Sequence, residues 1–241
     1  MTRRTATETN LVVDGIDSFY GELQVLRQAS LHVDLNEVVA LFGPNGHGKS
    51  TLLKAISGIH PPRSGSIKLN GVEISRLTSD RIVEMGLAYI PEARNLFNEM
   101  TVLENLRLGA FNRRARSKVD HNLELVFRLF PRLAERSTQP AATLSGGESR
   151  MLAVGRGLMS DAKLLLVDEP SIGLSPIMKK AVFGALNNIK QNTDISLLVV
   201  EQEVDYALAI ADRTYLFKKG RVVMERAAVD IDKSEIEEAY F

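Results

Sequence analysis

The stretch that decides the fold is VVALFGPNGHGKSTLLKAISG, residues 38–58. Its centre, GPNGHGKS at residues 43–50, fits the pattern G-x-x-x-x-G-K-[ST] of a phosphate-binding loop. The apolar run at 38–42 predicts a buried strand, and residues 50–56 predict the start of a helix. An ordinary glycine-rich turn is the alternative, but it does not account for a strand and a helix on either side. The pattern therefore predicts a βα unit whose turn binds phosphate.

Each residue type in this loop suits phosphate chemistry. The glycines let the backbone curl so that successive N–H groups point at phosphate oxygens, near the positive end of the helix dipole. Lys49 supplies a positive charge for the β- and γ-phosphates, and the Ser50 hydroxyl can hold Mg²⁺. We therefore predict a nucleoside triphosphate site. Its expected residues are Gly43, Pro44, Asn45, Gly46, Gly48, Lys49, Ser50 and Thr51.

The composition limits the classes of function. At 241 residues the chain can bury a substantial core in one domain, or in one domain with an insertion. Thirty basic residues balance thirty acidic ones, so the net charge carries no sign of a nucleic-acid partner, and we expect none. Because the sequence holds no cysteine, disulfides, thiolate metal sites and cysteine nucleophiles are excluded.

The hydropathy pattern carries no membrane span. The longest strongly apolar run, residues 164–167, ends at Asp168 and Glu169, far short of the ~20 residues that cross a bilayer. The N-terminal stretch MTRRTATETN is polar and lacks the apolar core of a secretion signal. We expect a cytoplasmic protein that acts at a membrane only by docking to a membrane-embedded partner.

Hydrophobic periodicity divides the chain into three sections. In the first third, strands are expected at residues 11–20, 24–33, 38–42, 66–69 and 87–90. The NG at residues 70–71 is a hairpin signal. Residues 101–133 carry leucine and phenylalanine at helical spacing. Later elements should alternate, with strands at 163–167, 195–200 and 213–217 and helices at 176–189 and 203–211.

These patterns predict an α/β fold with a phosphate-loop core, in which helices flank a mostly parallel sheet. We also expect an N-terminal antiparallel β-region and an inserted helical subdomain. One domain should span residues 1–241, with 1–97 and 159–241 as the nucleotide-binding core and 98–158 as the insertion. The basic stretch NRRARSK at 112–118 is expected to be a solvated loop or helix face, and a partner-binding patch is the alternative.

A second group of candidate residues is the acid pair in KLLLVDEPSIGLSP, residues 163–176. Asp168 and Glu169 follow a predicted buried strand, and open α/β sheets bind ligands at the carboxyl ends of their strands. We expect both acids to share a crevice with the phosphate loop. Asp168 is then a Mg²⁺ ligand, and Glu169 polarises the water that attacks the γ-phosphate. A cap or a turn is the alternative for such a pair.

A third group lies in TLSGGESRMLAVGRGLM, residues 143–159. Ser145 at a helix start is a capping residue, and a capped surface helix is the simplest interpretation. Gly146 and Gly147 expose backbone N–H groups at the positive helix end, which would form a second phosphate cradle. One chain would then carry two cradles for one triphosphate.

LSGGE at residues 144–148, with the phosphate loop and LLLVDEP, resembles the motifs of the ATP-binding-cassette (ABC) family, and the resemblance covers about residues 11–241. In that family two subunits pair head to tail, and each ATP lies between the phosphate loop of one and the LSGG cradle of the other. The resemblance implies ATP and Mg²⁺ as cofactors. It also implies that Tyr20 stacks on adenine, with strand packing as the alternative, and that SIGLS at 171–175 crosses the dimer interface. The residues implied for the second cradle are Ser145, Gly146, Gly147 and Glu148.

Three positions depart from the family pattern. Glu92, in LAYIPEARNLF, stands where the family usually has a Gln that contacts Mg²⁺ and senses the membrane partner; a carboxylate is the better ligand for a hard cation. Gln202 stands where the family usually has a His at the γ-phosphate, and an amide can donate a hydrogen bond but never become cationic. His47 replaces a small residue, and we expect its side chain to face solvent.

These departures, together with NEMTVLENL, SIGLSP and the ending EEAYF, resemble the shorter ATPase subunit of branched-chain amino acid importers. That class implies an ATPase dimer, with itself or a sister subunit, on the inner face of the cell membrane. The other implied partners are membrane permeases and, indirectly, an external solute-binding protein. The implied catalytic residues are Glu169, Gln202 and Lys49. Three alternatives remain open: an importer of urea or short amides, a lipid exporter, and a nucleotide-dependent switch with little turnover.

Overall fold

The computed structural model describes residues 9–231 and 233–238. Residues 1–8, which hold most of the polar N-terminal stretch, and residues 239–241, which end EEAYF, lie outside the described residues. No helix of the described part combines the length and the hydropathy that crossing a membrane requires.

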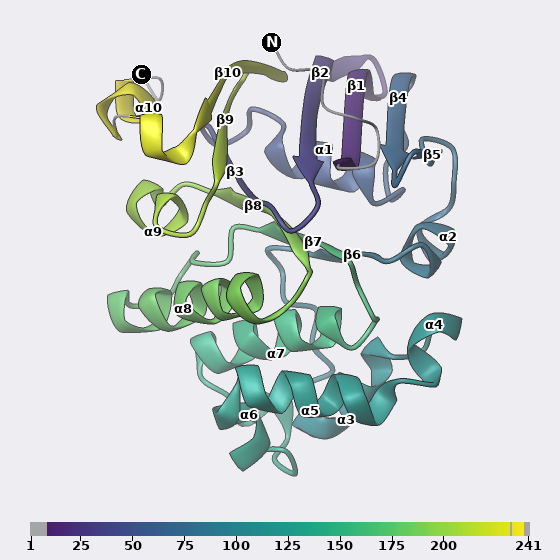
Figure 1. The fold of residues 1–241 in the computed structure, drawn as a ribbon, viewed down its shortest axis with the longest axis vertical. Coiled ribbons are helices and arrows are strands. Elements are labelled where there is room, and N and C mark those ends of the chain that lie inside the picture. Colours follow the sequence, from purple (N-terminus) through teal and green to yellow (C-terminus); the bar gives the residue numbers. More distant parts are fainter. Residues whose placement is uncertain (1–8, 232, 239–241) are drawn as a thin grey trace.

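Two sheets organise the described strands (Figure 1). An antiparallel sheet has the order β2-β1-β4-β5, and a larger sheet has the order β10-β9-β3-β8-β7-β6. In the larger sheet only the edge strand β10 runs antiparallel to its neighbour. The strands are β1 (Thr9–Tyr20), β2 (Leu23–Asp34), β3 (Val38–Phe42), β4 (Ser64–Leu69), β5 (Val72–Glu73), β6 (Leu87–Ile90), β7 (Leu164–Asp168), β8 (Ser196–Glu201), β9 (Arg213–Lys218) and β10 (Arg221–Ala227).

The central strands are buried on both faces. Every residue of β3, β7 and β8 is buried, which is why these strands are continuous apolar runs in the sequence. Side chains of β3 alternate between two cores. Val38, Ala40 and Phe42 pack among the helices, while Val39 and Leu41 pack toward α1 and the antiparallel sheet. The larger sheet is therefore the middle layer of the molecule.

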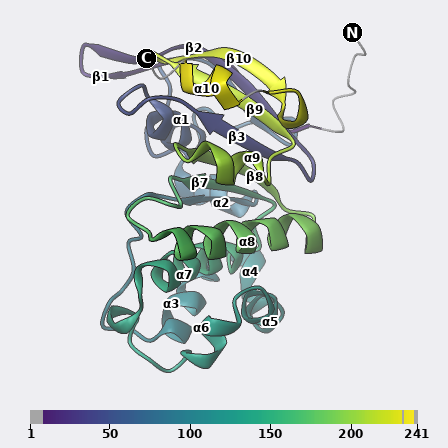
Figure 2. The same ribbon diagram turned by 90° about the vertical axis from the view of Figure 1, so that its left-hand side faces the viewer.

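The helices form a layer on the far side of this sheet. In Figures 1 and 2, α3, α5, α6 and α7 gather at the opposite end from the antiparallel sheet, and α1 contacts both β1 and β7. The helices are α1 (Lys49–Ile56), α2 (Ser79–Glu84), α3 (Val102–Gly109), α4 (Arg113–Arg116), α5 (Val119–Leu129), α6 (Pro131–Glu135), α7 (Gly146–Leu158), α8 (Pro176–Asn192), α9 (Val204–Leu208) and α10 (Lys233–Glu238). Short 3₁₀ turns lie at Ala141–Thr143 and Ala228–Asp230.

The structure confirms the predicted α/β class with an N-terminal antiparallel region. The predicted hairpin at NG is also confirmed: Leu69 pairs with Val72, and both Asn70 and Gly71 have the positive φ that such a turn requires. The basic stretch includes α4, and its partly exposed Arg114 and exposed Lys118 both pair with Asp161.

Other expectations for the elements were wrong. The helix expected at 203–211 ends at Leu208, because the chain must leave it for the sheet, where Asp212 N donates to Val38 O. The sequence analysis missed β10 and α2. The edge strand β10 is exposed at most of its positions, so its sequence shows no apolar alternation.

Candidate nucleotide-binding site

The phosphate loop lies between the buried end of β3 and the start of α1. A Cβ on Gly43, whose φ is +155°, would lie 2.1 Å from Phe217 O, so this position requires glycine. Gly48 caps α1 in a left-handed conformation that other residues rarely adopt. Local glycine chemistry therefore produces the loop that the sequence predicted.

The Lys49 side chain folds back onto the backbone carbonyls of this loop. Its side chain is buried, and Nζ donates to Gly43 O at 2.7 Å and to Pro44 O at 3.2 Å. Nζ also lies 3.7 Å from Glu169 Oε1. Burial lowers the pKa of Lys49, and the charges of Glu169 and Asp168 oppose that effect. The buried ammonium is placed to meet an anion that enters the loop.

Asp168 faces Ser50 from the end of β7. Ser50 Oγ donates to Asp168 Oδ1 at 3.1 Å, and Tyr89 Oη donates to Asp168 Oδ2 at 2.9 Å. Burial raises the pKa of Asp168, and these two hydrogen bonds work against it. The sequence analysis missed Tyr89; its place on β6, the neighbour of β7, emerges only from the strand order.

Glu169 and Gln202 meet at the ends of neighbouring strands. Gln202 Nε2 donates to Glu169 Oε2 at 2.7 Å, and the backbone N–H of Glu169 donates to Val200 O at 2.9 Å. Burial raises the pKa of Glu169, which the charge of Lys49 and the hydrogen bond from Gln202 oppose. Glu169 has a φ of +43°, a strained conformation for a residue with a side chain. The predicted residues 49, 168, 169 and 202 thus gather beside the phosphate loop, at the carboxyl ends of β7 and β8.

Glu201 is a buried acid that the sequence analysis missed. Its Oε1 accepts from Ser171 N at 2.8 Å, and its Oε2 accepts from Gln202 N at 2.8 Å and Glu203 N at 3.0 Å. This carboxylate therefore fixes two backbone segments, one at Ser171 and one at Gln202 and Glu203. The available signal was an acid at the end of an otherwise apolar strand.

The oxygen atoms of Ser50 and Asp168 are suitable ligands for Mg²⁺. Ser50 Oγ and the Asp168 carboxylate lie side by side, and Mg²⁺ in proteins takes one or two such ligands with water and phosphate oxygens. The Glu92 carboxylate is exposed, and its charge raises the pKa of both Asp168 and Glu169. Among the described residues no three His, Cys, Asp or Glu side chains group as a metal cage, so phosphate and water would supply the remaining ligands.

Tyr20 stands at the end of β1 with 45% of its surface exposed. It stacks on His60 with ring centroids 4.2 Å apart and 12° between the planes. The His60 Nε2 atom lies 3.0 Å from Phe19 O, in hydrogen-bonding contact. His60, which the sequence analysis missed, thus supports an aromatic ring that is not enclosed by strand packing.

The LSGGE segment forms the start of α7. Ser145 Oγ accepts from Glu148 N at 3.3 Å, and Glu148 Oε2 accepts from Ser145 N at 2.9 Å, which is a capping box. Glu148 also pairs with Arg136 at 3.0 Å. In the described residues, nothing in this segment has a hydrogen bond or ion pair with the phosphate loop of the same chain.

His47 is partly buried, so the expectation of a solvent-facing side chain was wrong in part. It lines a cavity of about 690 Å³ with residues of β2 and the turn between β9 and β10. Its carbonyl accepts from Gly220 N at 3.0 Å. Burial and the charges of Lys49, Lys218 and Lys219 lower the pKa of His47.

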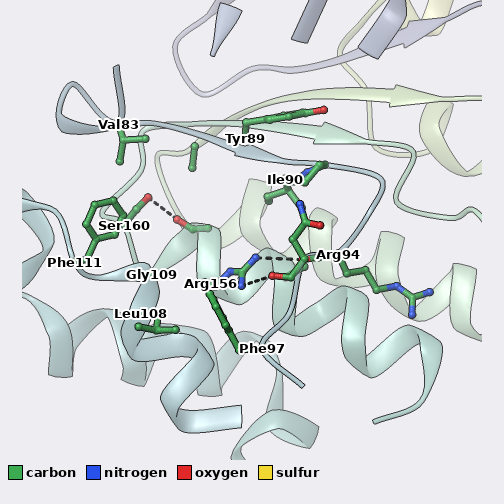
Figure 3. A pocket seen from close by; sticks show the side chains of 15 residues that line it. Val83, Tyr89, Ile90, Arg94, Phe97, Leu108, Gly109, Phe111, Arg156 and Ser160 are labelled. Atoms are coloured by element: carbon green, nitrogen blue, oxygen red, sulfur yellow. Dashed lines mark hydrogen bonds between the residues drawn. The ribbon is translucent and has the colours of Figure 1, made fainter. Parts of the chain in front are cut away.

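A groove of about 480 Å³ opens between β6 and the helical layer (Figure 3). Phe97, Phe111 and Leu108 line it and are exposed. Arg156 crosses its floor, with Nη1 donating to Asn95 O at 2.8 Å and Nη2 to Arg94 O at 3.2 Å. The groove is apolar, open, and directly connected to the segment that carries Glu92.

Comparison with known proteins identifies close relatives. Residues 26–172 match the family model described as ABC transporter. The high-affinity branched-chain amino acid transport ATP-binding protein BraG of Pseudomonas aeruginosa is 41% identical, and the match covers 95% of this chain and 98% of that protein. The probable branched-chain amino acid transport ATP-binding protein LivF of Archaeoglobus fulgidus is 36% identical, with 91% and 93% covered. A crystal structure of a nucleotide-free ATP-binding cassette from an ABC transporter superposes with a TM-score of 0.82 at 26% identity, with 96% and 94% covered.

Proposed function

Since the chain belongs to the ABC transporter family, whose ATP-binding cassettes hydrolyse ATP to power transport, we propose that it is the ATPase subunit of a branched-chain amino acid importer. The observation that carries the proposed ATPase activity is the set of contacts that joins the phosphate loop, Asp168, Glu169 and Gln202. The substrate class is supported by the names of two relatives that cover more than nine tenths of the chain.

In this proposal ATP binds in the phosphate loop with its adenine on the open face of Tyr20. The phosphates lie within the backbone of Gly43, Pro44, Asn45, Gly46 and Gly48. The remaining residues that bind the nucleotide are Lys49, Ser50 and Thr51. Mg²⁺ would be held by Ser50 and Asp168, with Glu92 close by, and would neutralise charge on the phosphates.

The catalytic roles follow from charge and contact. Glu169 accepts the proton of the attacking water. Its strained backbone places the buried carboxylate 3.7 Å from Lys49 Nζ of the phosphate loop. Gln202 fixes the orientation of that carboxylate through its 2.7 Å hydrogen bond. Lys49 would turn from the loop carbonyls to the β- and γ-phosphates once these are present, because a phosphate anion is a stronger acceptor.

The second cradle calls for a second ATPase subunit. We propose that Ser145, Gly146, Gly147 and Glu148 face ATP bound to a partner subunit, which is either a copy of this chain or a sister ATPase. Support comes from their position at a capped helix N-terminus, which favours anions, and from the lack, among the described residues, of a hydrogen bond or ion pair between this segment and the chain's own loop. The residues 98–158 would form the helical subdomain that carries this cradle.

The apolar groove in Figure 3 is the proposed docking site for a membrane permease. Exposed aromatic side chains around a hollow of this size suit an apolar helix of a partner. Docking there would hold the subunit at the inner face of the cell membrane. An external solute-binding protein would then act on it only through the permease.

Uptake by cells that carry Glu169→Gln tests the proposal. We expect uptake of labelled leucine, isoleucine and valine to stop, and phosphate release by the purified variant to fall by roughly 10² to 10⁴. The exposed Glu99→Gln change is the matched control and should alter neither. Loss of urea uptake alone would correct the substrate class. Absence of phosphate release from the wild-type chain would favour a nucleotide-dependent switch.

A further inference from the structure

Arg150 is the largest fully buried side chain among the described residues. It lies on α7, two residues after the LSGGE segment, with 0% of its surface exposed. Cations are almost never buried completely unless they are paired. In the described part of the chain, however, no carboxylate lies within ion-pair distance of this guanidinium. Its position therefore calls for an explanation other than a salt bridge.

Three backbone carbonyls hold the guanidinium. Nη1 donates to Pro91 O at 3.0 Å, and Nη2 donates to Glu92 O at 2.9 Å and to Glu169 O at 3.3 Å. These acceptors belong to the segment after β6 and the segment after β7, and Arg150 itself belongs to α7. One side chain thus joins α7 to the segments that follow β6 and β7.

The contact with Glu169 is made at its backbone carbonyl, which accepts both from Arg150 Nη2 and from the backbone N–H of Ile172, each at 3.3 Å. Its N–H is held by Val200 O of β8, and its carboxylate contacts Gln202 and Lys49. Arg150 supplies a side-chain donor to its carbonyl, at a residue whose φ of +43° needs support from its surroundings. The guanidinium therefore helps to keep the backbone conformation that aims the carboxylate.

The other two contacts lead to the apolar groove. Pro91 lines that groove, and Glu92 follows it directly. A shift of this segment would move two of the three acceptors of Arg150, and the guanidinium cannot follow without loosening its bond to Glu169 O.

We propose that Arg150 is a positioning residue that sets the backbone of Glu169 and ties it to the 91–92 segment at the groove. The inference rests on the proposed function, in which Glu169 accepts a proton from water. The guanidinium bonds to the 91–92 segment and to Glu169 at the same time, so its effect on hydrolysis passes through Glu169.

Two substitutions and one matched control test this role. Arg150→Met keeps most of the volume and removes every donor, while Arg150→Lys keeps the charge but cannot span three carbonyls with one ammonium. Arg76→Met is the control, because the Arg76 guanidinium also donates to two backbone carbonyls, Pro62 O and Arg63 O, without touching Glu169 or lining the groove. The full chain is assayed for phosphate release, for the KM of ATP and for thermal unfolding.

We expect Arg150→Met to lower kcat by roughly 10- to 10²-fold with the KM of ATP changed less than about 2-fold, since misplacement of a catalytic group acts on the chemical step. Arg150→Lys should recover part of the loss, and Arg76→Met should stay within about 3-fold of the wild type. In a Glu169→Gln background, Arg150→Met should add no further loss, because the residue acts through Glu169.

The outcomes separate this inference from the proposed function. Wild-type release that Glu169→Gln abolishes and Arg150→Met leaves unchanged would overturn the positioning role alone. A further loss in the Glu169→Gln background, or an equal loss in Arg76→Met, would show a purely structural role and overturn it too. If Arg150→Met does not fold, Arg150→Lys decides, and a wild-type kcat in that variant refutes the inference. Wild-type release that does not depend on Glu169 would refute the proposed function itself.

Discussion

Replacing His60 with alanine should weaken the binding of ATP without weakening the binding of a triphosphate that has no base. His60 covers one face of Tyr20 at 4.2 Å and contacts Phe19 O at 3.0 Å, so it holds the ring that is proposed to receive adenine. The phosphate loop lies at the other end of α1 and, in the described part of the chain, makes no hydrogen bond with the imidazole. The substitution should therefore affect only the base.

The size of the effect follows from these two contacts. An aromatic pair contributes ~0.5–1.5 kcal/mol beyond its burial. A hydrogen bond adds a net ~0.5–1.5 kcal/mol. Tyr20 itself remains and can still reach its stacking position, so only part of this sum should appear in ligand binding. We expect about 1 kcal/mol, which is a roughly 5-fold rise in the Kd of ATP.

Calorimetric titration of the purified chain with Mg-ATP and with tripolyphosphate measures both terms. His121→Ala is the matched control, because His121 is exposed on α5. His60→Phe, which keeps a ring and loses the hydrogen bond, should recover about half of the ATP affinity. An equal rise in Kd for both ligands would mean that the substitution disturbs the phosphate loop through α1. An unchanged Kd for ATP would refute the supporting role of His60.

Three further predictions concern the phosphate loop and the acids beside it. Because burial raises the pKa of Glu169 above 4.5 and only its ionised form accepts a proton, kcat should fall as pH drops through that raised pKa; Gln202→His should add a second step near pH ~6.5, and a pH–rate profile of both proteins checks this. Gly43→Ala should abolish ATP binding and lower stability by more than ~2 kcal/mol, since its Cβ would lie 2.1 Å from Phe217 O, as titration calorimetry and urea unfolding would show. Glu201→Gln should cost about 1–3 kcal/mol in urea unfolding, because it removes charge-assisted hydrogen bonds to three backbone N–H groups, and an unchanged midpoint would contradict that account.

The sequence by itself determined the features that depend on neighbouring residues. The phosphate loop follows from glycines at fixed spacing between an apolar strand and a helix, and the NG turn follows from two residues that tolerate positive φ. The acids after β7 could be placed at the ligand-binding edge because the carboxyl ends of parallel strands share one edge. In each case the physical cause lies within a few residues of the effect.

Only the tertiary structure decided which distant residues meet. Tyr89 reaches Asp168 because β6 is the neighbour of β7, and no periodicity in the sequence encodes strand order. Arg150 looks like one more polar residue of an amphipathic helix, yet it is buried on three carbonyls that come from two other segments. Buried polar groups must find partners, but the sequence does not say where those partners are. The fold brings them together, and with them the groups that surround Glu169.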